Sequence, residues 1–126
     1  MNLPENLMYT KDHEWAIQSG NIIKLGITDY AQDALGDVVY VGLPQVGLVV
    51  ESGDSFAEVE STKSVSDVYS PVAGKIITIN GSLSNTPEAL NSDPYGEGWI
   101  CEIEVDTQAP LTGLMSADEY REFISI

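Results

Sequence analysis

Lysine is scarce in this sequence, and Lys63 stands where a side chain can be presented for chemistry. It lies between two short runs of Val, Ser and Tyr that are typical of strands. Gly53 lies ten residues before it and Gly74 eleven residues after it. This spacing predicts a hairpin over about 56–70 with Lys63 at its tip and glycine turns at the far ends of both arms. A rigid hairpin would offer the lysine to a modifying enzyme in a fixed place. The hairpin alone, however, favours an ordinary surface lysine in a turn.

The elements that would position Lys63 are short strands punctuated by Gly, Pro and Asn turns. We predict strands over 22–27, 38–43, 47–51, 56–60, 65–69, 75–79 and 99–105. Three short helices are also predicted. They are Thr28–Leu35, one that starts at 86–88 with Pro87 at its first helical position, and a C-terminal helix over 120–124 behind a capping box at 116–119. Many short strands with such turns indicate a small sandwich or barrel.

Four segments of the chain resemble, in the same order, segments of glycine cleavage H-proteins. They are YTKDHEW (9–15), GITDYAQDALGD (26–37), VESTKSVSDVYSPVAG (59–74) and NSDPYGEGW (91–99). The first resembles the family's N-terminal strand, the second its first helix, the third its lipoylation segment and the fourth a late loop. The match is collinear from about residue 7 to residue 124. The resemblance implies a mainly β, lipoyl-domain-like barrel-sandwich hybrid with short added helices, including a C-terminal helix, in one lipoyl-carrier domain over 1–126.

The resemblance also implies a function. Lys63 would carry lipoate in amide linkage, and the strained ring disulfide would accept an aminomethyl group from glycine decarboxylase, the pyridoxal-phosphate-dependent P-protein. The arm would deliver this group to aminomethyltransferase, the T-protein, and be reoxidised by dihydrolipoyl dehydrogenase, the L-protein. A lipoate-attaching enzyme would be a further partner. The chain itself would be a non-catalytic carrier, and we expect a monomer because it visits several active sites.

Three acidic residues are candidates for holding the loaded arm. The aminomethyl thioether hydrolyses readily and ends in an amine, so a carrier should shelter it and offer a carboxylate. By resemblance, Glu14 and Asp67 match positions that line such a cleft. Asp12 stands where many relatives have Ser, and it would add an anionic contact or do nothing. The alternative is that these are ordinary solvated acids at strand edges.

Other reactive residue types favour structural roles. His13, the only histidine, has no Ser or Cys nucleophile placed with it by a motif, so we interpret it as a packed or surface residue. Cys101 lies in an alternating apolar run and is expected to be a buried, inert thiol. Trp15 and Trp99 are expected in the core or in a cleft wall. The sequence contains no ligand cluster for zinc or calcium and no phosphate-binding fingerprint.

The charge of the chain excludes some partners. Twenty acidic residues face five basic ones, for a formal net charge of −15. Such a surface repels nucleic acid and anionic membranes, and it can steer the protein toward basic patches on other proteins. The N-terminus shows no signal or transit pattern and no apolar run is long enough to span a bilayer, so we expect a cytoplasmic protein.

Three alternatives stay open. A biotin carrier shares the expected fold, but its lysine usually lies between methionines, whereas Thr62 and Ser64 flank Lys63 here. An H-like paralogue would use the same lysine in lipoate relay or sulfur-compound oxidation. An unmodified interaction module would use only its acidic surface. The intact mass of the native protein separates lipoyl, biotinyl and free lysine.

Overall fold

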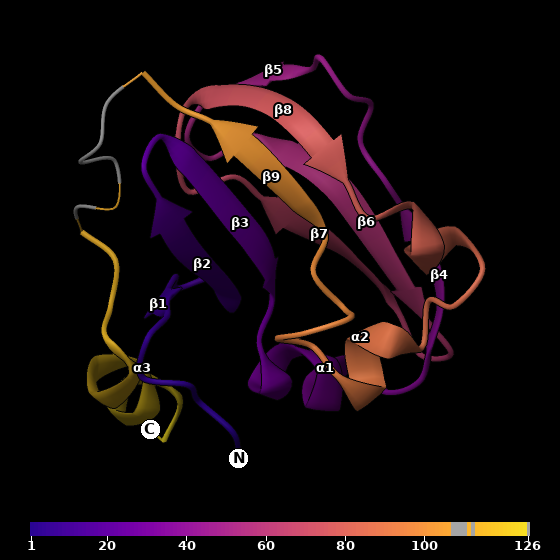
Figure 1. The fold of residues 1–126 in the computed structure, drawn as a ribbon. Coiled ribbons are helices and arrows are strands. Elements are labelled where there is room, and N and C mark those ends of the chain that lie inside the picture. Colours follow the sequence, from indigo (N-terminus) through magenta and orange to yellow (C-terminus); the bar gives the residue numbers. More distant parts are fainter. Residues whose placement is uncertain (107–110, 112, 126) are drawn as a thin grey trace.

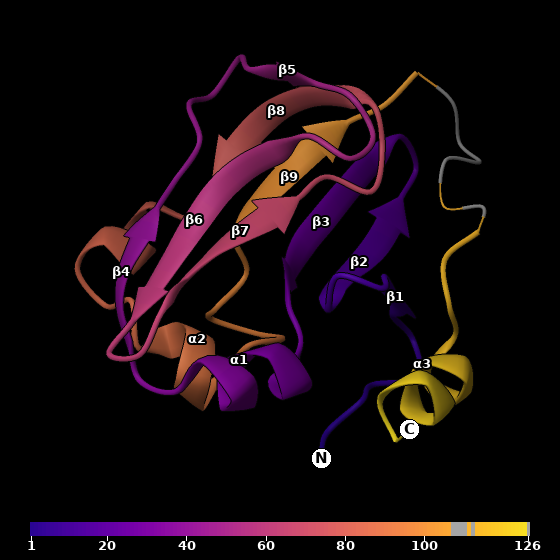
Figure 2. The ribbon, with the colours of Figure 1, turned by 180° about the vertical axis from the view of Figure 1, so that it is seen from behind.

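Two antiparallel sheets build the fold. In this computed structural model, residues 1–106, 111 and 113–125 are described. The larger sheet has six strands in the order β1-β2-β3-β9-β8-β5, and the smaller has the order β4-β6-β7. Figure 1 shows the six-stranded sheet toward the viewer, and Figure 2 shows the three-stranded sheet from the opposite side. This arrangement confirms the mainly β expectation.

The strands of the larger sheet place alternate apolar residues in a shared core. Ile23, Leu25, Ile76 and Ile103 are buried from three neighbouring strands, as expected for a sheet with one face packed against a second sheet. The strand bounds are β1 (Met8–Tyr9), β2 (Glu14–Ser19), β3 (Ile22–Ile27), β5 (Val49–Val50), β8 (Gly74–Ile79) and β9 (Cys101–Glu104).

The smaller sheet contains the hairpin that carries Lys63. Its strands are β4 (Val38–Gly42), β6 (Ser55–Ser61) and β7 (Val65–Tyr69). The two strands of the hairpin pair from Ser55 opposite Tyr69 to Glu60 opposite Val65. A bulge between Val38 and Tyr40 shifts the register of β4 against β6.

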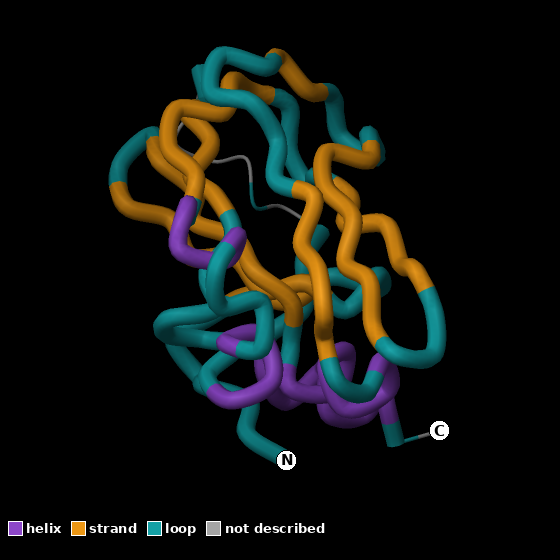
Figure 3. Tube along the Cα trace, turned by 90° about the vertical axis from the view of Figure 1, so that its right-hand side faces the viewer, coloured by secondary structure: helices purple, strands orange, loops and turns teal. Residues whose placement is uncertain are grey.

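Short helices gather at one end of the sheets, as Figure 3 shows. Helix α1 (Asp29–Leu35) begins one residue after the predicted start, because Thr28 is its N-cap and its Oγ1 accepts a hydrogen bond from Ala31 N (3.1 Å). Helix α3 (Ala117–Ile124) begins at the predicted capping box. Helix α2 covers Ala89–Ser92. No helix in the described part of the chain is long and apolar enough to cross a membrane.

Four local expectations need correction. Pro87 lies in a turn before α2 instead of at its first position, and a 3₁₀ turn over Gly81–Ser84 was not predicted. The segment 9–15 is a hairpin, because Tyr9 on β1 pairs with Trp15 on β2. Gly53 has a φ of +93° and does form a turn, but Gly74 lies in β8. A Cβ at Gly74 would collide with the Glu104 carbonyl oxygen, so a close strand contact requires glycine there.

Candidate functional site

Lys63 lies exposed at the tip of the β6–β7 hairpin, and hydrogen bonds hold the tip in shape. Ser61 N donates to Ser64 O (2.8 Å) across the turn. Ser61 Oγ accepts from both Lys63 N and Ser64 N (3.1 Å each). Thr62 N donates to Asp37 O (3.0 Å), which ties the tip to the start of β4. The lysine is therefore presented on a fixed turn.

The side chain of Lys63 passes beside the end of helix α1. A Cβ built on Gly36 would lie 3.0 Å from Lys63 Cε, and Gly36 has a φ of +83° at the helix C-cap. The positive φ is what favours glycine there, because the adjoining Lys63 side chain is flexible and could move aside. The lysine is nevertheless exposed, so an approaching enzyme can reach its amine.

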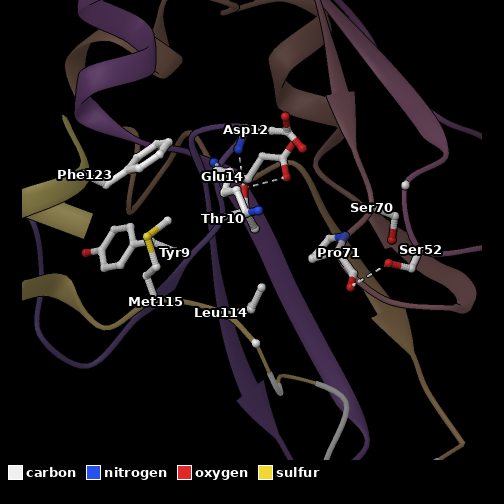
Figure 4. A pocket seen from close by; sticks show the side chains of 13 residues that line it. Tyr9, Thr10, Asp12, Glu14, Ser52, Ser70, Pro71, Leu114, Met115 and Phe123 are labelled. Atoms are coloured by element: carbon white, nitrogen blue, oxygen red, sulfur yellow. Dashed lines mark hydrogen bonds between the residues drawn. The ribbon is translucent and has the colours of Figure 1, made fainter. Parts of the chain in front are cut away.

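A pocket of about 690 Å³ opens on the same molecule. Figure 4 shows Tyr9, Met115 and Phe123 on one side of it, and Ser52, Ser70 and Pro71 on the opposite side. The wall between them is formed by the β1–β2 turn and is polar. The lining residues from that turn and its neighbours are Thr10, Lys11, Asp12 and Glu14.

Glu14 supplies the buried carboxyl of this pocket, and the residue is only 3% exposed. Tyr69 N donates to its Oε2 (2.7 Å), and Thr10 Oγ1 donates to its Oε1 (3.1 Å). Burial raises the pKa of Glu14 to about 8 because removal from water disfavours the charged form, and the two donors only partly offset this. Near neutral pH, a cation in the pocket would stabilise the carboxylate form of Glu14 and favour loss of its proton.

The tight turn between β1 and β2 places Glu14. Thr10 N donates to Glu14 O (2.9 Å), and His13 N donates to Thr10 O (3.2 Å). Thr10 Oγ1 accepts from the amides of Asp12 and Glu14 (3.2 Å each). His13 has a φ of +67°, a conformation that L residues seldom adopt and that tertiary contacts must hold.

His13 supplies those contacts. Its Nδ1 lies 2.8 Å from Tyr120 Oη, which lies 2.8 Å from Thr28 Oγ1. Its ring is also 4.7 Å from the ring of Tyr30. Burial lowers the pKa of His13 from its usual 6.5. The residue is packed between α1 and α3, so it fastens the turn that carries Glu14 to both helices.

The structure brings two of the three expected acidic residues together. Asp12 and Glu14 line the pocket. Glu14 is buried and does not fit the alternative of a solvated acid. Asp67 is exposed on β7, does not line the pocket, and accepts a hydrogen bond from Ser55 Oγ (3.0 Å). Its role in holding the arm stays a prediction.

The apolar wall of the pocket has no local signal in the sequence. Tyr9, Met115 and Phe123 come from the two ends of the chain. Tyr9 N donates to Met115 O (2.8 Å) and Met115 N donates to Tyr9 O (2.8 Å), and Tyr120 of the helix that carries Phe123 stacks on Tyr9. A hydrophobic residue near the end of a short helix, such as Phe123, is ordinarily taken for core. It is 39% exposed instead.

The other singled-out residues lie outside the pocket. Trp15 is buried, and its Nε1 donates to Pro94 O (2.9 Å). Trp99 is half-buried beneath Lys24, whose Nζ lies 5.1 Å from the ring centre. Cys101 is fully buried, and burial raises its pKa to about 12, which agrees with the expected inert thiol.

These features define a class of protein. Two antiparallel sheets, one of them ending in a rigid hairpin with a lysine at its tip, form a barrel-sandwich hybrid of the lipoyl-carrier type. The family profile of the glycine cleavage H-protein matches residues 7–126. The chain belongs to the glycine cleavage H-protein family, whose members carry lipoate as the carrier subunit of the glycine cleavage system.

Individual relatives agree over nearly the whole chain. The glycine cleavage system H protein of one Thermus thermophilus strain is 53% identical over 124 residues, covering 98% of this chain and 97% of its own. That of Mycobacterium sp. KMS is 52% identical over 127 residues, with the same coverage. The crystal structure of a glycine cleavage system H protein from Mycobacterium marinum matches with a TM-score of 0.89 and 37% identity, covering 98% of this chain and 99% of that one.

Proposed function

We propose that this chain carries lipoate on Lys63 and moves an aminomethyl group from glycine decarboxylase to aminomethyltransferase. Dihydrolipoyl dehydrogenase would then restore the oxidised arm. When bound, lipoate supplies a strained cyclic disulfide that reacts readily with carbon nucleophiles. The observation that carries the proposal is the exposed Lys63 on a hydrogen-bonded hairpin tip, in a chain of the H-protein family.

The residues around Lys63 fit an attached lipoyl group. Amide formation removes the lysine's charge and leaves a long neutral chain. The Ser61–Ser64 turn holds the backbone at its point of attachment. The hydrogen bond from Thr62 N to Asp37 O keeps this point of attachment close to α1. Because the attachment point is fixed, the arm's own rotatable bonds supply the movement between partner active sites.

We further propose that the pocket shelters the loaded end of the arm. Tyr69, whose N–H binds Glu14, lies four residues beyond Val65, which is about 13 Å along the strand. The arm starts at Lys63, two residues before Val65, so it would run back along β7 to reach the pocket. The carboxylates of Glu14 and Asp12 would accept hydrogen bonds from the terminal amine, and the apolar wall would exclude water. Asp67 is proposed as a contact along the route between the hairpin tip and the pocket.

We also propose that all 126 residues act as one carrier domain and that the protein works as a monomer in the cytoplasm. A monomer leaves the hairpin tip open to each partner in turn. The relatives reported above are bacterial, which supports a cytoplasmic location.

The experiment is aminomethyl transfer reconstituted from purified decarboxylase, aminomethyltransferase and flavoprotein, with wild type and Lys63→Arg. Arginine keeps the charge of the tip but cannot take the lipoyl group in the same way. We expect wild type to support transfer after lipoylation and Lys63→Arg to support none. Lys24→Arg, a change of the same type far from the hairpin, should behave as wild type. Full activity of Lys63→Arg would show that the arm is attached elsewhere.

A second experiment tests the shelter. We expect the aminomethylated arm to hydrolyse faster in Glu14→Ala than in wild type, because the amine loses its buried carboxylate partner. The measurement is the rate of loss of the aminomethylated form by intact mass. Equal hydrolysis rates would remove Glu14 from the proposal and leave the role of Lys63 untouched.

A further inference from the structure

An apolar pair lies beside the hairpin tip on the outward face of the β4–β6–β7 sheet. Tyr40 on β4 is opposite Glu60 on β6, and Glu60 is opposite Val65 on β7. Residues directly opposite one another in antiparallel strands have their side chains on the same face. Tyr40 and Val65 therefore flank Glu60 in one row, and Val65 is only two residues from Lys63.

Both apolar side chains of this row are open to solvent. Tyr40 is 53% exposed and Val65 is 59% exposed, whereas Val41 and Val59 of the opposite face are buried. The Tyr40 ring lies along β4 over Gly42, where a Cβ would be 3.6 Å from its Cε2. In Figure 2 this sheet lies in front of the six-stranded sheet. The row thus points away from the core.

The next row of the same face is acidic. Glu58 is paired with Gly42 on one side and Asp67 on the other, and both acids are exposed. Lys63 is the only lysine or arginine between residues 25 and 74, so strands β4, β6 and β7 contain no basic residue. Two exposed apolar side chains with carboxylates between and beside them fit a partner that offers apolar depressions surrounded by basic groups.

We propose that this docking face, made of Tyr40, Val65 and Glu58, binds the enzyme that attaches lipoate to Lys63. The proposal rests on the proposed function, because it needs Lys63 to be the attachment site. The attaching enzyme must bring a reacting carbonyl carbon to Nζ, within one lysine side chain of the hairpin. Enzymes that use the finished arm work at its far end. The attaching enzyme is therefore the partner whose chemistry requires it to cover the residues beside the tip.

The step itself is an acyl transfer from an acyl adenylate. The neutral Nζ of Lys63 attacks the lipoyl carbonyl carbon, and a C–N bond forms. The C–O bond to the phosphate breaks, AMP leaves with that electron pair, and a proton passes from nitrogen to solvent. Covering Tyr40 and Val65 would keep water from the same carbonyl and so favour the amide over hydrolysis.

The test uses the full-length protein before modification, with a purified adenylate-forming lipoate ligase, lipoate and ATP. The kcat/KM for the protein substrate is followed by intact mass. Tyr40→Thr/Val65→Thr removes apolar area and keeps strand-forming residues. We expect kcat/KM to fall about tenfold, as for truncated central interface residues. The matched control, Val46→Thr/Val49→Thr, changes two exposed apolar residues in and before β5 and should stay within about twofold of wild type.

Charge is tested separately with Glu58→Gln, which keeps the shape of the side chain. We expect about a threefold loss of kcat/KM at low ionic strength, and a loss that shrinks as salt screens the partner's basic rim. Glu104→Gln, an equal change of net charge on the other sheet, should show no such loss. Glu58→Gln also tests the docking face if the double threonine variant folds poorly.

Each outcome is decisive. Wild-type kcat/KM in both the double threonine variant and Glu58→Gln would overturn the docking face. A defect confined to aminomethyl exchange by protein that already carries lipoate would also overturn it, because the face would then serve the decarboxylase. If wild type itself is not acylated, the proposed function fails instead, and this result is distinguishable because it appears without any substitution.

Discussion

At the scale of single residues, the chemistry of the pocket depends on how Glu14 is buried. Removal from water favours its neutral acid, whereas donors from Tyr69 and Thr10 favour its carboxylate. Burial dominates, which raises the pKa of Glu14 to about 8. An amine docked beside it would reverse the balance. The pocket can therefore release a proton as it takes up a cationic group.

The same burial predicts how stability depends on pH. The pKa of Glu14 is about 8 in the folded chain and near 4.5 in the unfolded chain, so the folded state binds the additional proton between these values. Its contribution to the free energy of unfolding is present at low pH and is lost as pH rises through this window. We expect wild type to lose at least about 1 kcal/mol relative to Glu14→Gln between pH 5 and 8.

Urea unfolding of both proteins across that range measures the difference. The titration of His13 is common to the two proteins and cancels in the comparison. Parallel pH profiles for wild type and Glu14→Gln would contradict a raised pKa.

At the scale of elements, helix α3 holds one wall of the pocket. Tyr120 stacks on Tyr9 with ring centres 4.8 Å apart, and its hydroxyl lies in hydrogen-bond range of His13 and Thr28. Phe123, one turn further, lines the pocket. The helix is only eight residues long, and isolated helices of this length are unstable in water. Its cap and its aromatic contacts therefore decide whether the wall forms.

We expect Ser116→Ala to destabilise the protein by about 1 kcal/mol, because Ser116 Oγ accepts from Glu119 N (3.2 Å) in the capping box. Amide hydrogen exchange should accelerate in α3 more than in β3. Ser125→Ala, at the other end of the same helix, should lower the free energy of unfolding by less. Ser125 Oγ donates to Glu122 O (3.0 Å) at the C-terminal end and satisfies no N-terminal amide. Equal costs at both ends would show that the cap is not what stabilises α3.

At the scale of the whole molecule, acidic residues far outnumber basic ones. The net charge is −15, and the described residues form only one ion pair, between Arg121 and Asp118 (2.8 Å, both exposed). Such a surface repels itself in the folded state and attracts basic partners over long range. Stability and association should therefore respond to salt in opposite directions.

We expect the thermal midpoint of the folded protein to rise when NaCl is increased from about 0.02 M to 0.5 M, because screening weakens the self-repulsion and there is little ion pairing to lose. The rate of association with the lipoate-attaching enzyme should fall over the same range. Differential scanning calorimetry and stopped-flow association measure the two effects. A midpoint that falls with added salt would contradict this explanation.

Local patterns in the sequence predicted most elements because the signals act over a few residues. Strands β3 and β7 match their expected bounds, α1 lies within its predicted range of 28–35, and α3 begins at the predicted Ser116 capping box. The hairpin of β1 and β2 was missed. Its turn depends on the positive φ of His13, which Tyr120 holds from the other end of the chain.

The sequence by itself determined a small β protein of the H-protein family with Lys63 between two strands, because alternating side chains, turn residues and the family segments are all local properties. Only the tertiary structure decided the pocket. Its walls come from the β1–β2 turn, the 52–53 and 70–71 turns, and residues 113–123. These segments have no short-range signal for one another, and long-range strand pairing and packing bring them together. The same packing buries Glu14, leaves Asp67 outside the pocket and exposes Tyr40 beside the hairpin.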